Sequence, residues 1–361
     1  MKERIRYFDV IKGMAIYAVV MGHVMVYGAK GLNQAWLMTV IGLTHMPLFF
    51  FISGWFSCRM DAATGLLRAP SLWRRFLQLM VPMAVVPALW VWYLPHSGLN
   101  GAFTGGLERL WLSPMKFGYW FTLCLFEISV VFAAVFPLLR RRNTALTVTA
   151  AVAVWAALTA ASLLLPQKVT DAMGLTGVSM YWVPFMTGFI AAQHRRGFAR
   201  MTASGGWVTA AIVVCAACLF MYSWPARFEP YNRFALPLMH VSLAVAVIAV
   251  VKPWAERAFS PEASPTARTA AVVWVVLGRN SLAIYLLHYF LLFPVGAIAG
   301  PLAAMHRQFV PMAIFAFVAA GCIIAITLLA NAVIRRSPLL ALLLTGTVPA
   351  KRSKRESGAV E

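Results

Sequence analysis

The first apolar stretch of the chain carries a lysine and a histidine eleven residues apart, Lys12 and His23. In an α-helix, eleven steps of about 100° return to nearly the same face, with a rise of roughly 16 Å. Asp9 lies three residues before Lys12 and joins the same stripe one turn lower. A neutral imidazole can take a proton from a hydroxyl group, as acyl transfer to an alcohol requires. The stripe therefore predicts a catalytic His23, and its alternative role is a hydrogen bond that packs two helices together.

Three further histidines and a glutamate are also expected inside apolar stretches: His45, His240, His288 and Glu127. Glu127 follows Trp120 by seven residues, so these two side chains share one helix face. Ionisable groups are costly in a membrane-spanning helix and by default mark a site. Each of these residues also has a structural alternative, which for Glu127 is a buried ion pair.

A carboxylate could orient the His23 ring by accepting a hydrogen bond from it. Asp9 and Glu127 are the two candidates, and both are predicted to belong to the catalytic group. Depth favours Glu127, because Asp9 lies about 20 Å below His23 along the helix.

The composition places these residues in a membrane protein. Apolar residues make up 61% of the chain and charged residues 12%, and the mean hydropathy is +0.77. These values exclude a soluble protein of this length. The net charge is +20, but the basic residues fall in short clusters between apolar stretches, a pattern of membrane topology rather than of nucleic-acid binding. No disulfide, metal site or cleavable signal peptide is expected.

The apolar stretches predict an all-α, polytopic membrane helical bundle of about ten transmembrane helices. They cover residues 8–28, 36–57, 76–95, 117–139, 145–165, 178–194, 206–223, 234–252, 272–296 and 309–334. With the N-terminus in the cytoplasm, 24 of the 31 Lys and Arg residues fall on the cytoplasmic side, which is the side that basic segments mark. An even number of spans then puts both termini in the cytoplasm. Residues 1–334 form the expected transmembrane domain and residues 335–361 a basic cytoplasmic tail.

Four short motifs resemble those of one family of membrane enzymes. The first is a lysine, ten residues and a histidine, Lys12 to His23, in a segment that begins at Arg4. The others are MPLFFFISG (46–54), YWFTL (119–123, with Thr122 where leucine is more usual) and SLAIYLLH (281–288). In this order they are similar to the motifs of the acyltransferase-3 family of integral-membrane acyltransferases, and within it to sugar O-acetylases of the fucose 4-O-acetylase type.

The resemblance implies transfer of an acyl group, most often acetyl, from cytoplasmic acyl-CoA to a hydroxyl group. The acceptor would be a cell-envelope glycan or a lipid-linked sugar. Separately, the absence of a eukaryotic targeting signal in so compact a chain predicts a bacterial inner membrane. Acetyl-CoA would be a cosubstrate, with no cofactor bound permanently. The resemblance also implies that His23 is catalytic and that Lys12 helps to place the donor.

These implications give an expected site. We expect the donor at Lys12, Ser53, Arg74 and Arg75. We expect the acceptor at His45, Trp120, Tyr285 and His288. His23 would act as a base for direct attack or would carry the acyl group transiently, and the sequence leaves both routes open. The alternative function is a proton-coupled secondary transporter or exporter with a histidine relay, and a purely structural membrane protein is a third.

Overall fold

The computed structural model describes residues 5–28, 35–61, 63–93, 108–223, 225–292 and 309–348. These ranges contain helices and no β-strand, which confirms the all-α prediction. The helices are α1 (Arg6–His23), α2 (Ala35–Ser57), α3 (Leu72–Tyr93), α4 (Glu108–Leu112), α5 (Trp120–Leu139), α6 (Thr144–Leu164), α7 (Gln167–Ala172), α8 (Leu175–Gln193), α9 (Arg195–Ala203), α10 (Gly205–Ser223), α11 (Pro225–Ala258), α12 (Pro265–Arg279), α13 (Ser281–Leu287), α15 (Phe309–Ile334) and α16 (Pro338–Thr345). Three short turns are η1 (Val24–Gly28), η3 (Lys116–Gly118) and η4 (His288–Leu291).

Seven helices in the described ranges are long and apolar enough to cross a membrane: α1 with η1, α3, α5, α6, α8, residues 234–258 of α11, and α15. The number rises to nine if each of two bent helix pairs, α9 with α10 and α12 with α13, makes one span. In α2 the described apolar part is shorter, Ile41–Ser57. Together these elements correspond in order to the ten predicted stretches, and the chain is a multi-pass membrane protein.

The predicted stretch 272–296 is not one continuous helix. α12 ends at Arg279, α13 begins at Ser281, and the two helices are bent by 61°. The side-chain amide of Asn280 stabilises this break, because its nitrogen donates to Val276 O at 2.8 Å. Its carbonyl oxygen accepts a hydrogen bond of 3.0 Å from Asn331 on α15. A tertiary contact therefore interrupts this span, and the stretch's last residues, 293–296, lie outside the described ranges.

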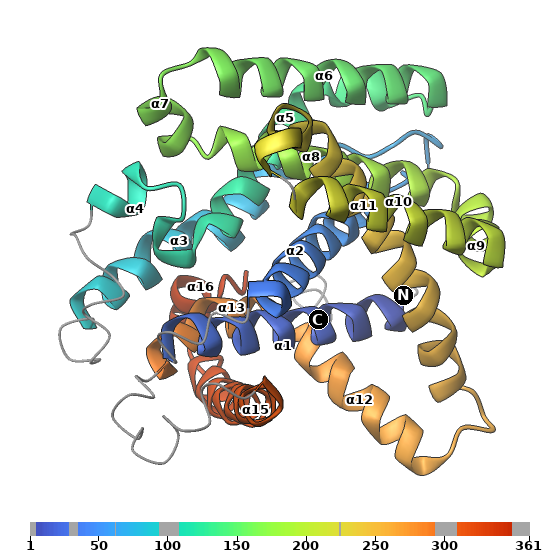
Figure 1. Ribbon diagram of the computed structural model, residues 1–361. Coiled ribbons are helices and arrows are strands. Elements are labelled where there is room, and N and C mark those ends of the chain that lie inside the picture. Colours follow the sequence, from blue (N-terminus) through green and yellow to red (C-terminus); the bar gives the residue numbers. More distant parts are fainter. Residues whose placement is uncertain are drawn as a thin grey trace, which may run out of the picture.

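Helix α1 packs against α2 on one side and is crossed by α12, and α2 also packs against α8 (Figure 1). The crossing of α1 and α12 is close. A Cβ atom on Gly13 would lie 2.1 Å from Trp274 O, and one on Gly278 would lie 1.8 Å from Asp9 O. Only glycine allows the backbones of α1 and α12 to approach this closely. The crossing brings the end of α12 to the first turns of α1.

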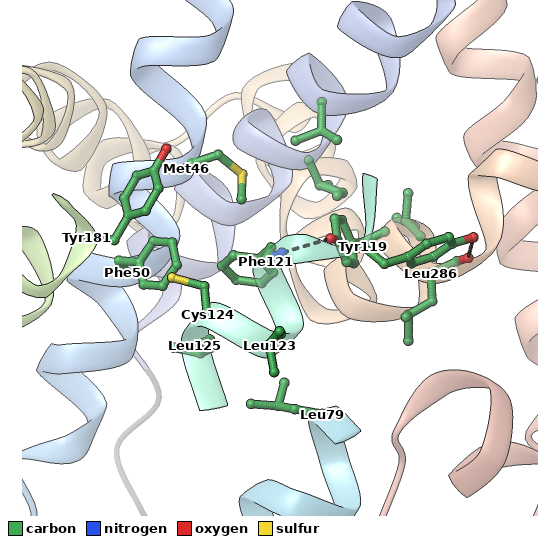
Figure 2. Packing of buried hydrophobic residues seen from close by; sticks show 14 of the residues in the cluster. Met46, Phe50, Leu79, Tyr119, Phe121, Leu123, Cys124, Leu125, Tyr181 and Leu286 are labelled. Carbon is green, nitrogen blue, oxygen red and sulfur yellow. Dashed lines mark hydrogen bonds between the residues drawn. The ribbon is translucent and has the colours of Figure 1, made fainter. Parts of the chain in front are cut away.

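An aromatic cluster joins α2, α5 and α8. Figure 2 shows Phe50 and Tyr181 side by side with Phe121 close to them; the first two rings stack at 4.5 Å, and Phe50 meets Phe121 edge-on at 5.1 Å. These are the favourable geometries for aromatic pairs. Tyr119, just before α5, donates its hydroxyl to Leu286 O at 3.1 Å, which ties this cluster to α13.

The segment predicted as a tail begins with a packed helix. The Ser337 side chain accepts a hydrogen bond from Leu340 N, Pro338 occupies the first turn, and Gly346 ends α16 in the left-handed conformation at φ +63°. These are the usual start and stop signals of a helix. α16 packs against α3 and α13, and residues 349–361 lie outside the described ranges.

Candidate active site

His23 is the last residue of α1, where the helix widens into the π-helical turn η1. Such turns are frequent at functional sites. Three rings surround the imidazole: His288 stacks on it with the centroids 5.0 Å apart and the planes 11° apart, Tyr289 lies at 5.0 Å and Tyr27 at 5.5 Å. His23 as a whole is half-buried.

The hydrogen bonds of His288 determine which nitrogen of His23 carries a proton. His288 Nδ1 lies 2.9 Å from Ile284 O, and because a carbonyl oxygen only accepts, Nδ1 must donate. In the neutral ring His288 Nε2 is then an acceptor, and His23 Nδ1 donates to it at 2.7 Å. The lone pair of neutral His23 is left on Nε2, where it accepts a long hydrogen bond of 3.4 Å from the Tyr289 hydroxyl; this nitrogen is the atom that could act as a base or a nucleophile.

Tyr289 is a neighbour of His23 that the sequence patterns missed. Its hydroxyl oxygen lies 3.4 Å from His23 Nε2. The chain tightens at His288 into the 3₁₀ turn η4, and the changed helical period brings two consecutive residues against His23. Gly118 makes room for the hydroxyl, since a Cβ atom there would lie 1.8 Å from Tyr289 Oη and the backbone φ is +90°.

A cavity of about 140 Å³ follows the predicted stripe of α1. Lys12, Ile16 and Val19 line it at helical spacing, and His23 is the next position on the same stripe. The facing walls come from α2, α3, α5 and α13 and include Ser53, Leu79, Phe121 and Tyr285. The structure therefore brings three of the predicted site residues, from three different helices, to one cavity: Lys12, Ser53 and Tyr285. We call this space the α1 cavity.

A second cavity of about 240 Å³ adjoins the first, because Gln78 and Leu282 line both. Three guanidinium groups line it, from Arg74 on α3, Arg279 at the end of α12 and Arg335 just after α15. Arg74 was predicted as a donor-binding residue. Arg279 and Arg335 were not, since nothing in the sequence links these distant segments to α3.

Asp9 holds the cations at the border of these cavities. Its side chain is buried, Oδ1 lies 2.8 Å from Lys12 Nζ, and Oδ2 lies 3.7 Å from Arg279 Nε. Asp9 thus belongs to the cationic end of α1 and does not reach His23. Asp9 contacts Lys12 and Arg279, and its catalytic role stays a prediction.

Arg75 and Arg74 point to different places, because neighbouring helical residues are turned by about 100°. Arg75 does not line the α1 cavity or the cavity of Arg74. It donates to Ser57 Oγ at 3.0 Å, and Ser57 Oγ in turn donates to Ser53 O at 2.8 Å. Arg75 therefore connects α3 to the last turn of α2 through Ser57.

The groups that face the two ring nitrogens of His23 are His288 and Tyr289, where the sequence suggests Glu127 as the partner that orients this ring. The Oε2 atom of Glu127 is buried without a hydrogen-bond partner and would lie 3.6 Å from a Cβ atom on Gly174. Its charged neighbour is Lys116, whose pKa is lowered by burial and raised by Glu127. Lys116 Nζ donates to the carbonyl oxygens of Trp111, Ser113 and Asp171 at 2.7, 3.1 and 3.0 Å. Glu127 thus forms part of a separate buried cluster.

The predicted acceptor residues differ in the contacts that the structure gives them. Tyr285 Oη donates to Gly118 O at 2.7 Å and accepts from Phe121 N at 3.3 Å, and both ring nitrogens of His288 are bonded. Trp120 stacks on Tyr181 at 5.3 Å. His45 donates from Nδ1 to Ile41 O, so the lone pair of its neutral ring is on Nε2.

Known proteins match this chain over most of its length. A family model described as an acyltransferase domain matches residues 5–331. The chain is 26% identical over 304 residues to the nodulation protein NolL of Sinorhizobium fredii, a match that covers 77% of this chain and 75% of NolL. No solved structure gives a significant match. The family match runs from just before α1 into α15, so it includes Lys12, His23 and His288.

Proposed function

The chain belongs to the acyltransferase-3 family of integral-membrane acyltransferases, and from this premise we propose that it transfers an acyl group, most often acetyl, from acyl-CoA to a hydroxyl group. The acceptor we propose is a cell-envelope glycan or lipid-linked sugar. The observation that carries the proposal is the α1 cavity, which begins at Lys12 and follows α1 as far as Val19, one helical turn before His23.

We assign the two adjoining cavities to the two parts of coenzyme A because of the residues that line them. Guanidinium groups bind phosphates through paired hydrogen bonds, so Arg74, Arg279 and Arg335 suit the nucleotide phosphates. Apolar walls at Ile16 and Val19 suit the pantetheine arm. The stripe from Lys12 to His23 rises roughly 16 Å, a distance that an extended pantetheine arm spans.

In the proposed reaction, His23 Nε2 takes the proton of the acceptor hydroxyl as its oxygen attacks the thioester carbonyl. The C–S bond then breaks, the coenzyme A thiolate leaves, and the proton passes from His23 to the sulfur. In the other route Nε2 attacks the thioester carbonyl first, the C–S bond breaks and the coenzyme A thiolate leaves. The acceptor oxygen then attacks the carbonyl of the acyl-imidazole, the C–N bond breaks, the imidazole is the leaving group, and the hydroxyl proton passes to the departing thiolate. Both routes need the lone pair on Nε2, which the bond from His23 Nδ1 to His288 supports.

We place the donor side in the cytoplasm of a bacterium and both termini on that side. The support is the charge distribution, with 24 of 31 basic residues in the segments assigned to the cytoplasm, and the arginine-lined cavity next to the first turns of α1. The acceptor would then approach His23 from the opposite, extracytoplasmic end of the bundle, past His45.

The test is release of coenzyme A from radiolabelled acetyl-CoA by the purified chain in nanodiscs, with and without membrane glycans. We expect His23→Ala to lower the rate about 10²- to 10⁴-fold, the usual contribution of a general base. His240→Ala is the matched control, since this buried histidine stacks on Tyr181 and lies outside the α1 cavity. Full turnover by His23→Ala would overturn the proposal.

A transporter remains the second candidate because of two observations. The bonded pair His23–His288 could relay protons, and the span of α12 and α13 is interrupted, as ion-binding spans of transporters often are. Under this function the chain would release no coenzyme A from any short acyl-CoA, and proteoliposomes would take up or export protons in a His288-dependent manner.

A further inference from the structure

A cavity of about 910 Å³ lies outside the proposed active site, between the end of α2, the turn before α6 and the junction of α8 with α9. Its lining contains no Asp or Glu but five arginines: Arg59, Arg142, Arg195, Arg196 and Arg200. We call it the arginine cavity. Such a concentration of guanidinium groups is suited to phosphate, which accepts several charge-assisted hydrogen bonds at once.

Among the residues that the structure describes, no carboxylate forms an ion pair with these arginines. In the described ranges the ion pairs involve Asp9 with Lys12 and Arg279, and none involves an arginine of this cavity. Arg142 donates to Gln193 O at 3.0 Å, and Arg195 lies over the Trp55 ring at 5.8 Å. Each of these contacts uses only part of a guanidinium group, so N–H donors remain for a ligand.

A buried amide side chain also lines the cavity. Gln193, the last residue of α8, is only 8% exposed, yet neither its Nε2 nor its Oε1 atom has a hydrogen-bond partner. A buried polar group without a partner is unfavourable and rare in folded proteins. A ligand with both an anionic oxygen and a hydroxyl would satisfy both atoms.

The position of the cavity points to the membrane surface. α9 carries Arg195, Arg196 and Arg200, buries Phe198 and is bent by 81° from the apolar helix α10. An amphipathic helix set across the end of a span lies at the level of the lipid headgroups. Two exposed apolar side chains, Phe56 and Met60, also line the cavity and could contact acyl chains.

The arginine cavity is separate from the donor site. Ser53 lines the α1 cavity and Trp55 lines the arginine cavity. Because these residues are two positions apart on α2, their side chains point about 200° apart around the helix axis. Helix α2 therefore separates the two cavities. A molecule in the arginine cavity would not contact the residues of α2 that line the α1 cavity.

We propose that the arginine cavity binds the headgroup of an anionic phospholipid, with the phosphodiester among the guanidinium groups and a headgroup hydroxyl at Gln193. A zwitterionic choline headgroup would place its own cation among five arginines and should bind more weakly. The apolar side chains at the rim favour a lipid over a soluble phosphate compound.

The test is native mass spectrometry of the full chain with phosphatidylglycerol, with phosphatidylcholine, and with competing sn-glycerol 3-phosphate. We expect the wild type to retain phosphatidylglycerol about tenfold more than phosphatidylcholine, a ratio typical of one or two charge-assisted hydrogen bonds. Arg195→Gln with Arg196→Gln should abolish this preference, and Gln193→Leu should weaken it without changing the charge. Arg336→Gln is the control, because this exposed arginine does not line the cavity.

Unchanged melting temperature and elution volume would show that the variants are folded. Retention of phosphatidylglycerol by both site variants at the wild-type level would overturn the proposal. Displacement of the lipid by equimolar sn-glycerol 3-phosphate would assign the cavity to a soluble phosphate ligand, and displacement by acetyl-CoA would assign it to the donor. Either displacement would therefore also overturn the lipid assignment.

Discussion

His23 Nδ1 lies 2.7 Å from His288 Nε2, a bond between residues 265 positions apart in the chain. Because Ile284 O accepts from the other nitrogen of His288, the order of protons along this chain of groups is determined. An imidazole bonded to a backbone carbonyl thus does here what a carboxylate does in many catalytic histidine pairs. It fixes the tautomer of His23 without introducing a charge into the span.

His288 should therefore affect the rate more than donor binding. We expect His288→Ala to lower kcat by about tenfold to a hundredfold, since His23 loses its acceptor and its fixed tautomer, a smaller loss than removal of the base itself. The KM for acetyl-CoA should stay within about twofold, because His288 does not line the α1 cavity.

His288→Gln separates a positioning role from a packing role. The glutamine carbonyl can accept from His23 Nδ1 in place of the imidazole nitrogen, so this variant should keep more activity than His288→Ala. If the two variants have equal kcat values and equal pH–rate profiles, His288 does not orient His23.

Much of the cationic end of the site could be predicted from the sequence. The pairing of Asp9 with Lys12 and the stripe that leads to His23 follow from helical periodicity alone, which is local. The positions of the spans follow from hydropathy in the same way. Ser53 and Tyr285 were also expected, from motifs, and both line the α1 cavity.

The remaining site depends on tertiary contacts that periodicity does not encode. The break at Asn280 is held by Asn331, and the 3₁₀ turn at His288 brings Tyr289 to His23. A prediction based on a uniform α-helix puts Tyr289 on a different face. Depth alone also suggested Glu127 as the partner of His23, but equal depth does not give proximity around the bundle axis.

Lys12 tests the donor end of the cavity. We expect Lys12→Met to raise the KM for acetyl-CoA about tenfold or more, because one charge-assisted hydrogen bond is worth about 1.5–3 kcal/mol. Lys252→Met is a matched control, since this lysine lies near the Tyr7 ring and does not line the α1 cavity. Steady-state kinetics in nanodiscs would measure both, and an unchanged KM in Lys12→Met would mean that Lys12 interacts with lipid instead.

Gly118 should tolerate no side chain. Alanine there would place its Cβ atom 1.8 Å from Tyr289 Oη at a φ of +90°, so Tyr289 must move away from His23. We expect Gly118→Ala to lower activity and to destabilise the protein by about 1–3 kcal/mol, as overpacking does. At Gly177, inside α8, the same change meets only Cys124 Sγ at 3.7 Å, an ordinary contact, so Gly177→Ala should melt no lower than the wild type. Equal melting temperatures of the two variants would contradict the close approach of Gly118 and Tyr289.

Lys116 and Glu127 should stabilise the fold as a pair, independently of catalysis. Lys116→Met removes the donor to three carbonyl oxygens and the positive neighbour of Glu127, which should destabilise the protein by about 1–3 kcal/mol. Lys168→Met, at an exposed lysine, should have no effect beyond the error of a thermal melt.

The double variant Lys116→Met with Glu127→Gln tests whether these two residues stabilise the fold as a pair. If the glutamate is tolerated in its buried position because of Lys116, then Glu127→Gln should recover part of the stability that Lys116→Met loses. The coupling free energy from this cycle should be about 0.5–3 kcal/mol, the range for residues that share one network. Strict additivity would show that Lys116 acts only through the carbonyl oxygens, and a loss of acyl transfer in Glu127→Gln without a loss of stability would return Glu127 to the catalytic group.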